Sequence, residues 1–510
     1  MGIIKSIQEL SDVPNLLVDE QEMSRITDWV NTYQGTPLWQ NSHWLDVKGD
    51  VHTDRMMSLR MAKVSAKKMA SLVFNQAATI TAYPVGQETQ PGKSTPKDNE
   101  SKPNVVLQTI LKENHFADTL ERELEYMFGT GGLAARETVE NGKVKISFAT
   151  ADAFVPISAD STGITECVIA NSFTRGGRYY TLLEWHTETP SDYHVRNQLF
   201  RSVSTDGSDL GSEVPLSECY PGVKTDSDYS KKLYTRPTFQ YVRPNIANNF
   251  SMNSSLGVPI YANAMDTLQM LDVTYNMLSD EMLTGKRRIV APDSMLRGKI
   301  NPATGQREWY VDWNEKVYQS FHDTGADSGL SKETIRDITL PLRNDTLIGT
   351  LNSLLKLYAS QTGFSAGTFS YDAATGMQTA TEVISQQSDT YQSKNSHETL
   401  VARFIQDIAT SCLELAKNAT SVPYNDTADV TVMVNFDDSI AKDRNDNAKY
   451  YQTMNGNKPL MPHIESIKRA NGLDDQTAAE WAEQIEDEEP GEGDMNSILE
   501  TNNGGDGDGS

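Results

Sequence analysis

Apolar residues in the first part of the chain recur with the period of a helix. Met57, Met61 and Val64 are separated by four and three residues, and Lys and Arg side chains occupy the intervening faces. This pattern predicts an amphipathic helix over 54–76. A second helix is expected over 105–128.

Alternation of apolar and polar residues replaces the helical period further along, most clearly over 143–148. Asn141-Gly142 comes directly before this run and is typical of a two-residue hairpin turn, and Gly176-Gly177 predicts a second turn of the same kind. We therefore expect 132–245 to fold mainly as antiparallel sheet. Its polar stretch, 203–229, is expected to be a long surface loop.

A stricter helical pattern begins at residue 257. Seven apolar residues step alternately by three and four, the spacing of an apolar seam: Tyr261, Ala264, Leu268, Leu271, Tyr275, Leu278 and Met282. The spacing predicts a helix over 257–284. Because no apolar partner lies close to it in the sequence, five of these residues are expected to form a seam between subunits: Leu268, Leu271, Tyr275, Leu278 and Met282.

The remaining elements follow this helix in a definite order. A mixed segment, 286–340, is expected to contain a hairpin, and apolar spacing predicts helices over 343–362 and 379–417. The alternating residues 430–435 predict a strand. Two or three short helices are expected over 441–485.

The chain is acidic, and it is long enough to form domains with hydrophobic cores of their own. The 510 residues include 45 Lys and Arg against 70 Asp and Glu, a formal net charge of −25. About half of that charge lies after residue 470, where 13 acidic residues occur without Lys or Arg. Because residues 486–510 have little apolar content to offset the entropy of ordering, we expect a disordered acidic tail there.

The sequence lacks the signals of a membrane or exported protein. No apolar run approaches the roughly 18 residues of a spanning helix, and the first fifteen residues contain no apolar signal core. Cys167, Cys219 and Cys412 are far apart and lack metal-ligand spacing, which fits a reducing cytosol.

No motif with the spacing of a catalytic, cofactor or metal site is present. The best phosphate-loop candidate, Gly86–Ser94, has five residues between its glycines instead of four, and one of them is Pro91. The eight histidines show no HExxH or HxH spacing, and His397 is expected to be a packed or capping residue. We therefore expect no enzyme, no cofactor and no metal.

The most basic run is Lys286, Arg287 and Arg288, at the C-terminus of the seam helix. Cations at that end of a helix offset its dipole, so the run is explained either as a helix-end charge cluster or as a contact to a phosphate backbone or an acidic partner.

The order of helix, inserted mixed segment, helix, short loop with glycines and aromatic residues, and long helix resembles the portal proteins of tailed double-stranded DNA phages of Gram-positive bacteria. The resemblance covers about residues 20–485. Five segments carry it: Thr362–Phe369, Thr379–Val383, Tyr391, Asn395–His397 and Met61–Asn75.

The resemblance implies an α+β portal fold with the following parts: a wing over 1–256, stem helices over 257–284 and 342–363, a clip over 285–341, a tunnel loop over 364–378, a long wing helix and strand over 379–437, and a helical crown over 438–485. The tunnel loop would line the DNA channel through Phe364, Ser365, Thr368, Phe369, Ser370, Tyr371 and Thr375. The alternative is a buried connector whose aromatic residues pack under the long helix.

The resemblance also implies a function and partners. The chain would form a ring, usually of twelve copies, at one vertex of the capsid, as the channel for packaging and ejection of double-stranded DNA. The basic run and the rest of the clip would contact the terminase large subunit and then the head-completion or adaptor protein. Major capsid and scaffold proteins would surround a ring that assembles in the host cytoplasm and stays in the virion.

Two other classes remain as alternatives. Another virion structural protein, such as a minor capsid or scaffold-like protein, would also be acidic and oligomeric, but the predicted sheet over 132–245 argues against an all-helical scaffold. A packaging ATPase would need the phosphate loop that Gly86–Ser94 fails to provide.

Overall fold

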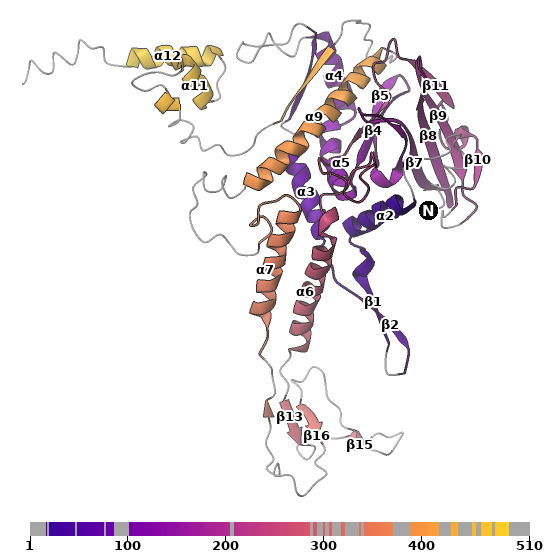
Figure 1. Ribbon diagram of the computed structural model, residues 1–510, viewed down its shortest axis with the longest axis vertical. Helices are drawn as coiled ribbons and strands as arrows, with labels where there is room; N and C mark the ends of the chain where they lie inside the picture. Colours follow the sequence, from indigo (N-terminus) through magenta and orange to yellow (C-terminus); the bar gives the residue numbers. More distant parts are fainter. Residues whose placement is uncertain are drawn as a thin grey trace, which may run out of the picture.

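The structure is a computed structural model of the 510-residue chain. It describes residue 17, residues 20–45, 48–75, 78–85, 101–204 and 209–285, short segments at 289–292, 299–300, 305, 307–308, 318–321 and 336–337, and residues 341–370, 388–417, 430–436, 451–454, 461–471 and 475–488. An α+β body carries two projecting helices and, beside them, a slender hairpin (Figure 1).

The first part of the body contains, among its described residues, the helices α2 (Glu20–Gln34), α3 (Met61–Val73), α4 (Lys102–Glu113) and α5 (Phe116–Thr130). The helix predicted from residue 54 starts only at Met61, because Val51–Arg55 is strand β2, paired with β1 (Asn41–Leu45). The helix predicted over 105–128 is two helices. His115 separates them in the left-handed conformation, with φ 47°.

The predicted antiparallel sheet is confirmed. One sheet has the order β12-β4-β5, and the other has the order β10-β9-β8-β7-β6, with β11 also paired to β9. The strands are β4 (Leu133–Glu140), β5 (Lys143–Thr150), β6 (Phe154–Ala159), β7 (Ile164–Arg175), β8 (Arg178–Glu188), β9 (Asp192–Arg201), β10 (Ser212–Val214), β11 (Asp226–Ser230) and β12 (Phe239–Val242).

Both predicted turns of this sheet are confirmed. Asn141 and Gly142 have φ 52° and 76°, and Gly176 and Gly177 have φ 57° and 74°, as two-residue hairpin turns require. The loop predicted over 203–229 is wrong in part, since β10 and β11 lie within or across it.

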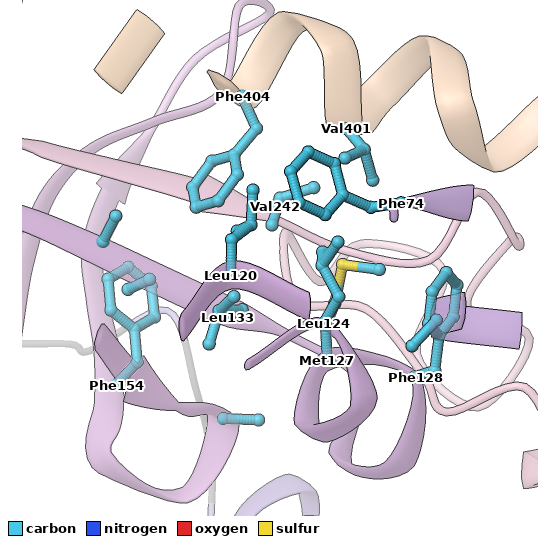
Figure 2. Close-up of a cluster of buried hydrophobic side chains, with 14 of the residues drawn as sticks. Phe74, Leu120, Leu124, Met127, Phe128, Leu133, Phe154, Val242, Val401 and Phe404 are labelled. Carbon is cyan, nitrogen blue, oxygen red and sulfur yellow. The ribbon is translucent and has the colours of Figure 1, made fainter. Parts of the chain in front are cut away.

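Helix α9 (Ser388–Ala416) covers the body from one side. It packs on β4, β12, α3 and α4, and on β18 (Val430–Asn435), which pairs with β3 (Thr79–Pro84). Figure 2 shows the core beneath it, where side chains from α9, α5, the end of α3 and the sheets converge: Phe74, Leu120, Leu124, Met127, Phe128, Leu133, Phe154, Val242, Val401 and Phe404. Each fully buried side chain of this size stabilises the fold by roughly 1.5–3 kcal/mol.

Two antiparallel helices project from the body, α6 (Met265–Thr284) and α7 (Asn344–Gln361) (Figure 1). Helix α6 starts eight residues later than predicted. Tyr261 obeys the apolar spacing because it is buried in the body, with its hydroxyl 2.6 Å from Gly129 O and 2.8 Å from Trp29 O. No helix in the described part of the chain is both long and apolar enough to span a membrane.

Short strands lie between the two projecting helices in the sequence. β13 (Ile289–Pro292) pairs in parallel with β16 (Tyr318–Phe321) and antiparallel with β17 (Arg336–Asp337). The hairpin expected in this segment is present, as β14 (Lys299–Ile300) paired with β15 (Arg307–Glu308).

The C-terminal region contains helices α11 (His463–Asn471) and α12 (Asp475–Glu488), which pack on each other through Ile467, Ala478 and Ala482. Short helices were predicted here. Helix α12 continues to Glu488, past the predicted start of the tail at residue 486, and the rest of the tail lies outside the described residues.

Candidate channel and subunit surfaces

The two projecting helices are joined at both ends. At the body end, Thr267 Oγ1 donates to Gln361 Oε1 at 2.8 Å. At the far end, Glu281 accepts bonds from Arg343 N at 3.1 Å and Arg343 Nη2 at 2.8 Å. These hydrogen bonds hold the pKa of Glu281 below its ordinary value. The bonds between Glu281 and Arg343 therefore fix the distance between the end of α6 and the start of α7, where the inserted segment begins and ends.

The apolar seam of α6 faces α7 at its body end. Leu268 is 4% exposed and Leu271 is 0% exposed, and both belong to the core of the single chain together with Leu351 and Leu355 of α7. The expectation that the seam lies between subunits is therefore wrong for Leu268 and Leu271. The spacing identified a buried face correctly, but its partner lies in the same chain, beyond the inserted segment.

The other three seam residues are not enclosed in this way. Tyr275 and Leu278 are half-buried, and Met282 is 58% exposed. Further apolar side chains of the projecting helices, and Leu342 just before α7, are also exposed, and the sequence analysis did not single them out: Met270, Met277, Leu283, Leu342, Ile348 and Leu357. An apolar surface this extended on a projecting element is typical of a contact surface with another protein.

The charge of the projecting helices is negative. Helix α6 contains Asp266, Asp272, Asp280 and Glu281 without any Lys or Arg, while α7 has Asp345 and Lys356. The basic run Lys286, Arg287 and Arg288 follows α6 and lies outside the described residues.

The segment that connects α7 toward α9 is packed. Phe364 is 1% exposed and Ser365 is 4% exposed. Ser365 N donates to Thr390 Oγ1 at 2.9 Å, and Thr390 N donates to Ser365 Oγ at 3.3 Å. The ring of Phe369 lies 5.1 Å from that of Phe364 and 5.9 Å from that of Tyr358, between centroids.

These contacts correct part of the tunnel-loop expectation. Phe364 and Ser365 are too buried to line a channel, so for them the buried connector is the right description. Thr368, Phe369 and Ser370 are half-buried, and Tyr371 and Thr375 lie outside the described residues.

Tyr358 joins the body end of α7 to α3 through hydrogen bonds. Its hydroxyl lies 2.7 Å from Ser65 Oγ and 3.1 Å from Met61 O, and burial raises its pKa. Nearby, Lys68 Nζ of α3 lies 5.9 Å from the centroid of the Phe369 ring. The segments Met61–Asn75 and Thr362–Phe369, which were both noted in the sequence, therefore meet at one junction between the projecting helices and the body.

Gly363 at this junction has φ 77°, and an added Cβ would lie 2.6 Å from Ser393 Oγ. We expect Gly363→Ala to lower the free energy of unfolding by about 1–3 kcal/mol, because the left-handed backbone and the close contact both oppose a side chain. Urea unfolding measures this. Gly349→Ala, where nothing lies within 4 Å of the added Cβ, is the matched control, and an equal loss in both variants would contradict the argument.

Ionisable groups are buried in the body. Glu137 is 0% exposed, accepts a bond from Ser411 Oγ at 3.0 Å, and has its pKa raised by burial to about 8. His397 is buried, as expected; its Nδ1 accepts from Asn245 N at 3.0 Å, and burial lowers its pKa to about 4. Within the described ranges, no group of three His, Cys, Asp or Glu side chains could hold a metal ion.

An α+β body with a projecting antiparallel helix pair and an inserted segment between the two helices is compatible with a portal fold. Comparison with protein families agrees. The family model for "Phage portal protein, SPP1 Gp6-like" matches residues 18–491, nearly the whole chain, and the chain belongs to this family. A search of curated proteins found no match.

Proposed function

We propose that the chain assembles into a ring of twelve copies around a DNA channel, with α6 and α7 as its stem. The strands between them would form the clip, the sheets with α2–α5 and α9 the wing, and α11 with α12 the crown. The observation that carries the proposal is the projecting α6–α7 pair, which is fixed at both ends and exposes apolar side chains along its length.

The acidity of the stem suits the passage of DNA. Duplex DNA carries one negative charge per roughly 1.7 Å, and each phosphate that a protein neutralises adds affinity. Helix α6 has no Lys or Arg, and the charge of Arg343 at its far end is paired with Glu281, so this helix offers no free cation that would hold the duplex in one position. The DNA would therefore move along the channel with few attractive contacts.

Residues at the exit of the α7–α9 junction are proposed to approach the DNA, namely Thr368, Ser370, Tyr371 and Thr375. We expect lysines at Ser370 and Thr375 to slow or stall packaging while the ring still assembles, because cations would bind the passing phosphates. Packaging of a defined DNA into capsids carrying these variants measures the effect. Normal filling would remove this segment from the channel.

The partners follow from the same assignment. The clip, with Lys286, Arg287 and Arg288 at its start, would dock the terminase large subunit during packaging and the head-completion or adaptor protein afterwards. Capsid and scaffold proteins would surround the wing at one vertex of the virion, after assembly in the host cytoplasm.

Sedimentation of the purified chain without nucleotide tests this proposal. We expect a single species with the mass of about twelve 56.6 kDa chains and no ATP hydrolysis. A monomer at all concentrations would favour the other candidate class, a virion structural protein that does not form the portal ring. ATP turnover abolished by Lys93→Ala would indicate a packaging ATPase instead.

A further inference from the structure

In the part of the chain that the structure describes, no element covers the β1–β2 hairpin. Its strands pair from Asn41 with Arg55 to Leu45 with Val51, and every described side chain in them is exposed. Leu45 and Val51, at the tip, are each 68% exposed. An isolated two-stranded hairpin is at best marginally stable in water, so a second surface is needed to hold it.

The base of the hairpin is fixed to the stem. Asp272 of α6 accepts bonds from Leu59 N at 2.8 Å and Trp39 Nε1 at 3.1 Å. Asn276, one turn further, accepts from Met57 N at 2.9 Å and donates to Met57 O at 2.8 Å. Because both flanks of the hairpin are bound to the same part of α6, its direction relative to the stem is set.

The hairpin extends in the same general direction as α6, on the side away from α7, and diverges from that helix toward its tip (Figure 1). A strand of five residues spans about 17 Å, whereas α6 rises about 12 Å from Asn276 to its end. The tip therefore reaches the far end of the stem. Exposed apolar side chains gather there as well: Met282 at 58%, Leu283 at 63%, Leu342 at 48% and Ile348 at 42%.

We propose that the hairpin of one copy packs on the far end of the next copy's stem, with Leu45 and Val51 against Leu342 and Ile348. The inference rests on the proposed ring, in which each copy presents one side to one neighbour and the opposite side to the other. The hairpin and α7 lie on opposite sides of α6, so the hairpin cannot reach the α7 of its own chain.

Cross-linking between these two surfaces tests the proposal. The background is Cys219→Ser, since Cys167 and Cys412 are buried. With a short bismaleimide, the Val51→Cys/Leu342→Cys chain should give a ladder of covalent species beyond the dimer, and neither single variant should. The matched control is Val203→Cys/Leu342→Cys, because Val203 is 85% exposed elsewhere on the body, and it should give no ladder.

Assembly provides the second measurement. Val51→Asp should keep the wild-type melting temperature but raise the chain concentration needed for half-assembly about tenfold or more, since a carboxylate would be desolvated at every contact. Val203→Asp should change neither quantity.

The outcomes separate the two claims. If the wild-type chain assembles but the double-cysteine chain gives no ladder and Val51→Asp assembles normally, the hairpin contact is wrong and the ring stands. The same result is expected if another virion protein covers the hairpin. A wild-type chain that never assembles overturns the proposed function and this inference with it.

Discussion

Leu271→Ala is expected to lower the free energy of unfolding of the chain by about 2–5 kcal/mol. Leu271 of α6 is fully buried in the core of the single chain, and its truncation leaves a cavity there. Met277→Asp, six residues further along the same helix, should leave the free energy of unfolding within about 0.5 kcal/mol of wild type, since Met277 is 54% exposed. It should instead prevent ring assembly.

Urea unfolding and sedimentation of the two variants separate these effects. Met252→Asp is the control for the charge, because Met252 is 91% exposed on the body, and it should change neither stability nor assembly. If Leu271→Ala leaves stability unchanged and abolishes the ring, the seam would face a neighbouring subunit after all. If Met277→Asp assembles as wild type, the exposed face of α6 is not a subunit contact.

Glu137→Gln is expected to stabilise the chain at neutral pH. Burial raises the pKa of Glu137 from 4.5 to about 8, so the folded chain keeps a proton that the unfolded chain loses across this interval. The contribution of Glu137 to stability is complete below pH 4.5 and is lost as pH rises toward 8. At 1.36 kcal/mol per pH unit, the loss between pH 4.5 and pH 7 is on the order of 3 kcal/mol.

Glutamine has the same shape and cannot ionise, so the variant should show a shallower fall in stability with rising pH. Urea unfolding at several pH values measures the slope. Glu140→Gln is the matched control, because Glu140 is exposed on the same strand, and it should keep the wild-type slope. A variant at Glu137 with an unchanged slope, or with lower stability at pH 7, would contradict the buried protonated carboxyl.

His397 acts in the opposite direction. Burial lowers its pKa from 6.5 to about 4, so its contribution to stability is complete above pH 6.5 and is lost as pH falls toward 4. Together the two groups place the highest stability between about pH 4.5 and pH 6.5, and Glu137→Gln should extend this pH range upward.

Local chemistry explains why parts of the fold could be predicted. Asn141-Gly142 and Gly176-Gly177 fix hairpin turns through their own backbone preferences, so the sheet followed from sequence. The start of α3 and the break at His115 could not be placed, because tertiary contacts decide between continuing a helix and ending it.

The candidate surfaces were harder to predict for a related reason. Periodicity shows that Leu268 and Leu271 are buried but not what covers them, and the covering helix α7 comes only after the inserted segment. The small polar residues of the α7–α9 junction suggested a loop in contact with DNA. Its first part is buried instead, and hydrogen bonds join Ser365 to Thr390 there. No local sequence pattern predicts this pairing, because the two residues belong to different elements.

End-on electron micrographs of the purified chain test the central claim most directly. The account predicts class averages of a closed ring with a central opening at least as wide as a DNA duplex. In side view, the stems should converge around that opening. Monomers, open filaments or a ring without a central opening would contradict it.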